Sequence, residues 1–89
     1  MILVYRMTMT ITLKLFAAYR EALGSGELLL EVAPGTTVAQ VLTRLVQDHP
    51  ELGRWQTVTR FGVNQAFVSA ETPLQQGDEV VFIPPVSGG

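Results

Sequence analysis

One stretch of this sequence has the spacing of an amphipathic helix, and it limits the possible folds more than any other feature. Its apolar residues recur at i, i+3, i+4 and i+7, so they share one helical face; they are Val38, Val41, Leu42 and Leu45. Thr37 stands where an N-cap is needed, and Gln40 completes a capping box with it. Pro50 disfavours helical backbone in the residue before it, so the helix is expected to end near His49. One such helix can cover one face of a sheet, which predicts a two-layer α+β domain.

Strand patterns lie on both sides of this helix. The predicted strands are residues 9–15, 27–32, 60–63, 66–68 and 79–83. The first alternates apolar and polar residues with a period of two, which is typical of a half-buried strand. In the second, Leu29 faces outward between two glutamates. Asn64 and Gln65 separate the two short strands, and because Asn tolerates positive φ they are predicted to form a tight hairpin.

The last strand, residues 79–83, is rich in β-branched and aromatic residues, which favours an interior position in the sheet. The first two strands can pair as a hairpin. The helix-containing crossover separates the first strand from the last, so these two are expected to pair in parallel. A mixed sheet of about four to five strands packed on one main helix in this order is the β-grasp layout. Residues 17–23 are expected to form a helical turn or loop, and residues 50–57 a loop whose Leu52 and Trp55 cover the end of the core.

The chain has room for one domain. Its 89 residues are too few for two independent cores, and a composition of 47% apolar and 16% charged residues suits a compact fold. The domain is assigned to residues 9–83, with residues 1–8 as an N-terminal extension and residues 84–89 as a C-terminal tail. Met7 and Met9 offer alternative starts for the extension.

Composition excludes several classes of function. The net charge is −2 and the six basic residues are scattered, so the chain lacks the basic patch on which nucleic-acid binding depends. No stretch approaches the roughly 20 apolar residues needed to cross a bilayer. The absence of cysteine excludes disulfides, thiolate metal sites and a persulfide, and His49 cannot build a metal site alone. Arg6 and Lys14 interrupt the apolar N-terminal run, which argues against a signal peptide, so a cytoplasmic protein is expected.

The sequence contains no recognisable catalytic constellation: it has no phosphate-binding loop, no dinucleotide-binding glycine motif and no nucleophile elbow. Asp78 and Glu79 are neighbours on a strand and point to opposite faces, so they cannot share a proton. His49 is expected to sit at the negative end of the helix dipole. Tyr19 and its polar neighbours are expected to form a polar cap over a sheet edge.

The tail is the remaining feature to which a function can be assigned. Pro84 and Pro85 stiffen its start, because proline fixes φ and removes a hydrogen-bond donor. Gly88 and Gly89 end it without side chains. Fully extended, the six residues 84–89 reach about 20 Å. A stiff base with a slim tip suits the insertion of a terminal carboxylate into a narrow tunnel of another protein.

Residues 82–89 (FIPPVSGG) resemble the C-terminal signature of the molybdopterin synthase small subunit (MoaD family). Residues 72–80 (TPLQQGDEV), 63–65 (VNQ) and 15–21 (LFAAYRE) are also similar to segments of that family. The resemblance extends over roughly residues 10–89, and the ending is its most specific part.

The resemblance implies a sulfur carrier that works through its terminal carboxylate. An adenylyltransferase related to ubiquitin-activating enzymes would use ATP to adenylate Gly89, and sulfur would then replace AMP to give a thiocarboxylate. The charged tail would enter the large subunit of molybdopterin synthase and donate sulfur to cyclic pyranopterin monophosphate (precursor Z), forming the molybdopterin dithiolene. The chain itself would bind no cofactor and no metal. It would be a sulfur-donating subunit of a heterotetramer and not a catalyst alone.

The same resemblance implies roles for further residues. Gly88 would give clearance in the tunnel, and Pro84 and Pro85 would aim the tail. Docking around its base would use Phe16, Arg20 and Phe82, each of which has a core or surface role as an equal alternative.

Three other functions are compatible with the sequence. The chain could carry sulfur for thiamine thiazole or another thio-cofactor. It could be a ubiquitin-like modifier joined to lysines through Gly89. The third alternative is a β-grasp interaction module with an inert tail.

Overall fold

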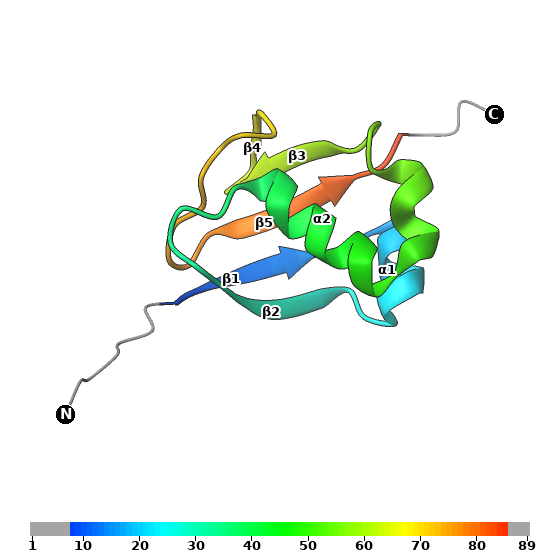
Figure 1. Cartoon of the computed structure of the whole chain (residues 1–89), viewed down its shortest axis with the longest axis horizontal. Coiled ribbons are helices and arrows are strands. Elements are labelled where there is room, and N and C mark those ends of the chain that lie inside the picture. The colour runs from blue at the N-terminus through cyan, green and yellow to red at the C-terminus, as the bar shows by residue number, and fades with distance from the viewer. Residues whose placement is uncertain (1–7, 86–89) are drawn as a thin grey trace.

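The predicted strands and main helix are present, to within one residue of their expected ends, in a computed structural model that describes residues 8–85 (Figure 1). In chain order the elements are β1 (Met9–Lys14), α1 (Ala17–Leu23), β2 (Glu27–Val32), α2 (Val38–Asp48), the 3₁₀ helix η1 (Pro50–Trp55), β3 (Arg60–Val63), β4 (Ala66–Val68) and β5 (Glu79–Ile83). The α+β prediction is therefore confirmed.

The five strands form one sheet in the order β2-β1-β5-β3-β4. β1 and β5 are parallel, with Leu13 level with Val80, and the other neighbouring pairs are antiparallel. The interior position of β5 and its parallel pairing with β1 were both predicted. Because β5 lies between β1 and β3, it joins the β1–β2 hairpin to the β3–β4 hairpin (Figure 1).

Helix α2 crosses one face of this sheet and buries the stripe that the sequence predicted. All four apolar residues of the stripe are at most 5% exposed. The capping box forms as expected: the Gln40 N–H donates to the Thr37 hydroxyl at 3.2 Å, and the Thr37 N–H donates to the Gln40 side-chain oxygen at 2.9 Å. The N–H groups of Val38 and Ala39 donate to backbone carbonyls of residues 72 and 70. Every backbone N–H from residue 37 to residue 40 therefore has an acceptor.

The end of the core is closed by α1 and η1, and here two expectations need correction. Residues 50–57 were expected to be a loop, but Pro50–Trp55 form a 3₁₀ helix. Proline suits a helix start because it lacks an N–H and none is needed at that position. Leu52 is buried and Trp55 half-buried against the core, as predicted.

Tyr19 was expected in a polar cap over a sheet edge but is completely buried, with its ring centroid 5.6 Å from that of Phe82. The Thr59 hydroxyl donates to the Trp55 carbonyl at 2.7 Å. Thr59 has one hydroxyl proton, so the Tyr19 hydroxyl donates to the Thr59 oxygen in the bond between them. A polar side chain is accepted in the core because every hydrogen-bonding group around it has a partner.

The β3–β4 hairpin turns at Asn64 and Gln65, whose φ angles are 51° and 71°. This left-handed pair is what a two-residue turn between twisted strands requires. The Asn64 side chain also donates to Asp78 at 2.9 Å and accepts the Glu79 N–H at 2.9 Å. The turn is thereby held against the start of β5.

Candidate functional site: the base of the C-terminal tail

The candidate site lies where β5 ends, because the tail predicted to carry the function starts there. β5 occupies the middle of the sheet, and its last residue, Ile83, pairs with Arg60 of β3. Pro84 is half-buried and Pro85 is exposed. Residues 86–89, which include Gly88 and Gly89, lie outside the described residues. The rigid sheet therefore fixes the point and direction from which the tail leaves.

A groove borders this point on the sheet face that α2 does not cover. It has a volume of about 400 Å³ and is lined by Val58, Arg60, Phe67, Ile83, Pro84 and Pro85. We call it the tail-base groove. A smaller hollow of about 130 Å³ adjoins it over β3, β4 and β5 and shares Phe67 and Ile83 with it. The two form one continuous, mainly apolar surface that leads to the start of the tail.

Two exposed apolar side chains make this surface unusual for a small protein. Phe67 is 75% exposed and Val58 is 50% exposed. Phe67 stands opposite Gly62 in the β3–β4 pair. A Cβ on Gly62 would lie 2.7 Å from a Val81 methyl group, too close for an ordinary contact. Glycine at this position therefore leaves the hollow open. Contiguous exposed apolar surface of this kind is typical of sites that bind a ligand or another protein.

The structure separates the three predicted docking residues. Phe16 directly follows β1 and is 53% exposed. The parallel register that sets Lys14 beside Val81 brings Phe16 level with Ile83, at the same end of the sheet as the tail. Arg20 is exposed on α1, with its guanidinium beside Gly26, and it does not line the tail-base groove.

Phe82 has to be reassigned. Its side chain is fully buried between the rings of Tyr19 and Phe61, whose centroids are 5.6 and 5.7 Å from its own. It offers no surface to a partner, and the core role that the sequence left as an alternative applies. The alternation along β5 explains this: Phe82 shares a face with Val80, whereas Val81 and Ile83 point to the open face.

Sequence reasoning did not single out Phe67 or Val58. Phe67 shares with Gly62 the outward parity of the β3–β4 hairpin, and this was the available signal. An aromatic residue in a short strand is more often a core residue, so its position on the surface needed the structure.

The charged groups near the tail base are few. Arg60 is the charged residue of the tail-base groove. Asp78 lies at the far end of β5 and accepts from the Asn64 side chain and from the Gln75 N–H at 2.8 Å, so it has a structural role. Residues 8–85 hold no group of three or more His, Asp or Glu side chains that could bind a metal ion. Within the same range, no helix has the length and apolar character to span a membrane.

Comparison with known proteins decides the family. The model of the ThiS family matches residues 13–89 of the chain. The chain belongs to the ThiS/MoaD family of ubiquitin-like sulfur carriers.

Curated relatives of this sulfur carrier carry a common name. A protein of Chlamydomonas reinhardtii named molybdopterin synthase sulfur carrier subunit is 35% identical, over 91% of the chain and 100% of the relative. One of the same name from Escherichia coli K12 is 37% identical, over 83% of the chain and 93% of the relative.

Solved structures confirm the ubiquitin-like β-grasp fold of the carrier. SAMP1 from Haloferax volcanii matches with a TM-score of 0.75 and 31% identity, over 90% of the chain and 99% of that protein. The ubiquitin of Caldiarchaeum subterraneum matches with a TM-score of 0.60 at 24% identity, over 92% and 99% of the two chains. A chain from the complex of subunits 1 and 2 of the molybdopterin-converting factor of Helicobacter pylori shares the fold at 22% identity and a TM-score of 0.61, over 91% and 100%.

Proposed function

We propose that this chain is the sulfur carrier subunit of molybdopterin synthase and that Gly89 carries the sulfur as a thiocarboxylate. The observation that carries the proposal is the shared name of the curated relatives, which extends over most of the chain. The structure adds a physical reason, because the rigid central strand and two prolines lead directly to the predicted working end. The cytoplasm is the compartment that suits this function.

Activation has to come from another protein. A carboxylate is a poor electrophile, because it is anionic and its oxygen leaves badly. This chain has no cysteine and no phosphate-binding loop. An ATP-using adenylyltransferase would join the Gly89 carboxylate to AMP and release pyrophosphate, and a sulfur donor would then displace AMP. The product is a thiocarboxylate, with one terminal oxygen replaced by sulfur.

Discharge would take place in the large subunit of molybdopterin synthase. The tail would enter that subunit, where its sulfur attacks cyclic pyranopterin monophosphate, and water would restore the carboxylate. Two such transfers complete the dithiolene, in a heterotetramer of two small and two large subunits. Gly88 and Gly89 would pass a narrow channel because neither has a side chain.

The tail-base groove is the surface on which a partner would seat while the tail is inserted. Its Phe67, Val58 and Ile83 supply apolar area, and Arg60 adds one positive charge beside them. Phe16 lies at the same end of the sheet and can extend the contact. Burial of exposed aromatic side chains typically dominates such interfaces.

Intact-mass spectrometry tests the central step. The full chain, incubated with the adenylyltransferase, ATP and sulfide, is expected to exchange one oxygen for sulfur, and the thiocarboxylate should convert cyclic pyranopterin monophosphate in the presence of the large subunit. A variant that lacks Gly89, and one with a single residue added after it, should fold normally but gain no sulfur. Dithiolene formation by either variant would contradict the proposal.

A second candidate function is protein modification, because SAMP1 of Haloferax volcanii is by its name a small archaeal modifier protein. In that case Gly89 would form isopeptide bonds with lysines of many proteins. Peptide mass spectrometry of cells that express the tagged chain separates the two functions. Isopeptide adducts between the C-terminal segment of this chain and lysines of many proteins favour a modifier, whereas a single large-subunit partner and a thiocarboxylate favour the sulfur carrier.

A further inference from the structure

Strand β2 forms one edge of the sheet, and its backbone groups can be assigned individually. The Leu15 N–H donates to the Gly26 carbonyl at 3.0 Å, and this pair continues the β1–β2 register. In antiparallel strands, pairs that exchange hydrogen bonds alternate with pairs whose groups point away. The residues of β2 whose N–H and C=O point away from β1 are therefore Glu27, Leu29 and Glu31.

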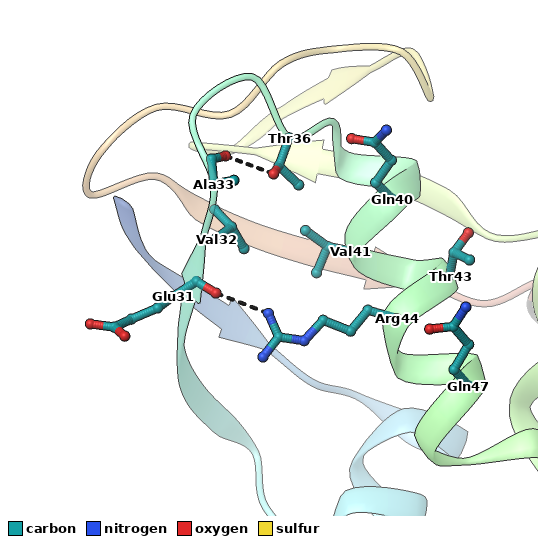
Figure 2. A pocket seen from close by; sticks show the side chains of 9 residues that line it. All are labelled: Glu31, Val32, Ala33, Thr36, Gln40, Val41, Thr43, Arg44 and Gln47. Carbon is teal, nitrogen blue, oxygen red and sulfur yellow. Dashed lines mark hydrogen bonds between the residues drawn. The ribbon is translucent and has the colours of Figure 1, made fainter. Parts of the chain in front are cut away.

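Some of these outward groups are already satisfied. The Ser25 hydroxyl accepts from the Glu27 N–H at 3.2 Å and donates to the Glu27 carbonyl at 2.8 Å. The Arg44 guanidinium reaches across from α2 and donates to the Glu31 carbonyl at 2.9 Å (Figure 2). Among the described residues, the N–H and C=O of Leu29 and the N–H of Glu31 have no partner. They form a short open stretch, bounded at one end by Ser25 and at the other by Arg44.

The side chains of this stretch indicate what could bind it. Leu29 is 73% exposed, and Glu27 and Glu31 flank it on the open face of the sheet. Lys14 lies 3.2 Å from Glu27 and offsets part of the charge. A second copy of this chain, paired antiparallel about Leu29, would set Glu27 opposite Glu31 twice, and like charges in that position repel. A strand with basic residues on both sides of an apolar one is complementary.

A groove accompanies the edge on the helix side. It has a volume of about 440 Å³ and lies between β2 and α2. Figure 2 shows Val32 and Val41 facing each other across it, with Thr43, Arg44 and Gln47 along the helix. Successive side chains of an added strand point to opposite faces. One set of alternate side chains of the added strand would thus lie beside Leu29 on the open face, and the other set would point to the helix side, where the groove lies.

We propose that the β2 edge is a second docking site, which takes an extended segment of a partner protein in which an apolar residue has a lysine or arginine two positions before and after it. The apolar residue lies beside Leu29, the basic residues pair with Glu27 and Glu31, and the intervening residues point to the helix side of the sheet, toward the groove. One strand, β1, separates this edge from β5, the strand that leads into the tail. A partner can therefore hold the chain here while the tail is engaged elsewhere.

The test uses the full chain and the peptide acetyl-Thr-Lys-Val-Ile-Val-Lys-Thr-amide, followed by amide NMR and hydrogen exchange. The amides of Leu29 and Glu31 are expected to shift and gain protection, whereas those of Leu28 and Leu30, which face β1, should change less. Replacement of both peptide lysines by glutamate should weaken binding about tenfold or more, because two favourable charge pairs become repulsive.

Matched controls distinguish strand addition through backbone hydrogen bonds from nonspecific binding of the peptide. N-methylation of the peptide isoleucine removes the N–H that would donate to the Leu29 carbonyl and should abolish binding without altering the side chains. Leu29→Pro removes an outward N–H that the sheet does not use and should also weaken binding, whereas Leu29→Ala, which keeps the N–H, should weaken it less. The methylated peptide needs no protein variant, so it decides the question even if Leu29→Pro fails to fold.

Three results would overturn the proposal. They are equal binding of the methylated peptide, shifts centred on Phe67 and Ile83, and Leu29 and Glu31 amide shifts that depend on protein concentration without peptide. The second would place the peptide in the tail-base groove, and the third would show that a second copy occupies the edge.

Discussion

Tyr19 joins three parts of the core through one side chain. Its ring packs against Phe82 of β5, and its hydroxyl donates to Thr59, which in turn donates to Trp55 of η1. Burial raises the pKa of the Tyr19 hydroxyl above its ordinary value of 10.0. The folded protein therefore holds this proton more tightly than the unfolded chain does.

This difference predicts a loss of stability in alkali. Below about pH 10 both states keep the proton and the contribution of Tyr19 is constant; as the pH rises through the raised pKa, the unfolded chain ionises first and the free energy of unfolding falls. Tyr19→Phe removes the ionisable hydroxyl and with it this part of the pH dependence of the free energy of unfolding. Urea unfolding from about pH 8 to about pH 11 should show a steeper alkaline decline for the wild type than for Tyr19→Phe. Parallel declines would contradict the assignment.

Single residues also show where sequence reasoning succeeded and where it failed. The outward position of Leu29 followed from alternation and is confirmed. The burial of Tyr19 did not follow, because its partner Thr59 lies 40 residues away in the sequence. The same limit applies to Phe82 and Phe67, whose exposure depends on which face of the assembled sheet α2 covers.

The start of helix α2 combines a local capping box with two contacts to residues distant in the sequence. Thr37 and Gln40 satisfy each other's backbone N–H groups. The N–H groups of the two residues between them donate to the backbone carbonyls of residues 72 and 70. Elements with such periodic or capping patterns were predicted to within a residue. η1 was missed because a short 3₁₀ helix has no apolar period of its own.

The capping box gives the prediction at this scale. Thr37→Ala leaves the Gln40 N–H without its acceptor and should lower the free energy of unfolding by about 1 kcal/mol. Thr37→Ser keeps the oxygen and is the matched control. Urea denaturation of both variants measures the effect, and equal losses for Ala and Ser would show that the hydroxyl does not cap the helix.

On the scale of the molecule, the sheet fixes the position of Pro84 and Pro85, with which the proposed tail begins. β5 is held on both sides by β1 and β3, and Pro84 and Pro85 follow directly. The sequence predicted this arrangement and the family, since both depend on local patterns. It did not predict the tail-base groove or the open β2 edge, because each is assembled from segments that meet only in the folded sheet.

Replacement of both prolines tests whether a stiff exit matters. Pro84→Ala with Pro85→Ala should leave the fold intact, because both residues lie beyond β5. Each proline restricts the chain by roughly 0.4–1 kcal/mol, so sulfur transfer to the pterin in the large subunit should slow by about fourfold to thirtyfold when both are replaced. Single-turnover transfer from the thiocarboxylated protein measures this, with Pro34→Ala, in the remote turn before α2, as control. An unchanged rate would show that the tail needs no stiffening.

The central place of β5 also determines when the protein can fold during synthesis. The chain emerges from the ribosome N-terminal end first, and its last strand must fill the gap between two hairpins made earlier. Until residues 79–83 are free, the inner edges of β1 and β3 have no neighbour and the halves of the sheet cannot close. Completion of the domain thus waits until β5 has left the ribosome, and a nascent chain stalled just short of β5 would present two unpaired edges to chaperones.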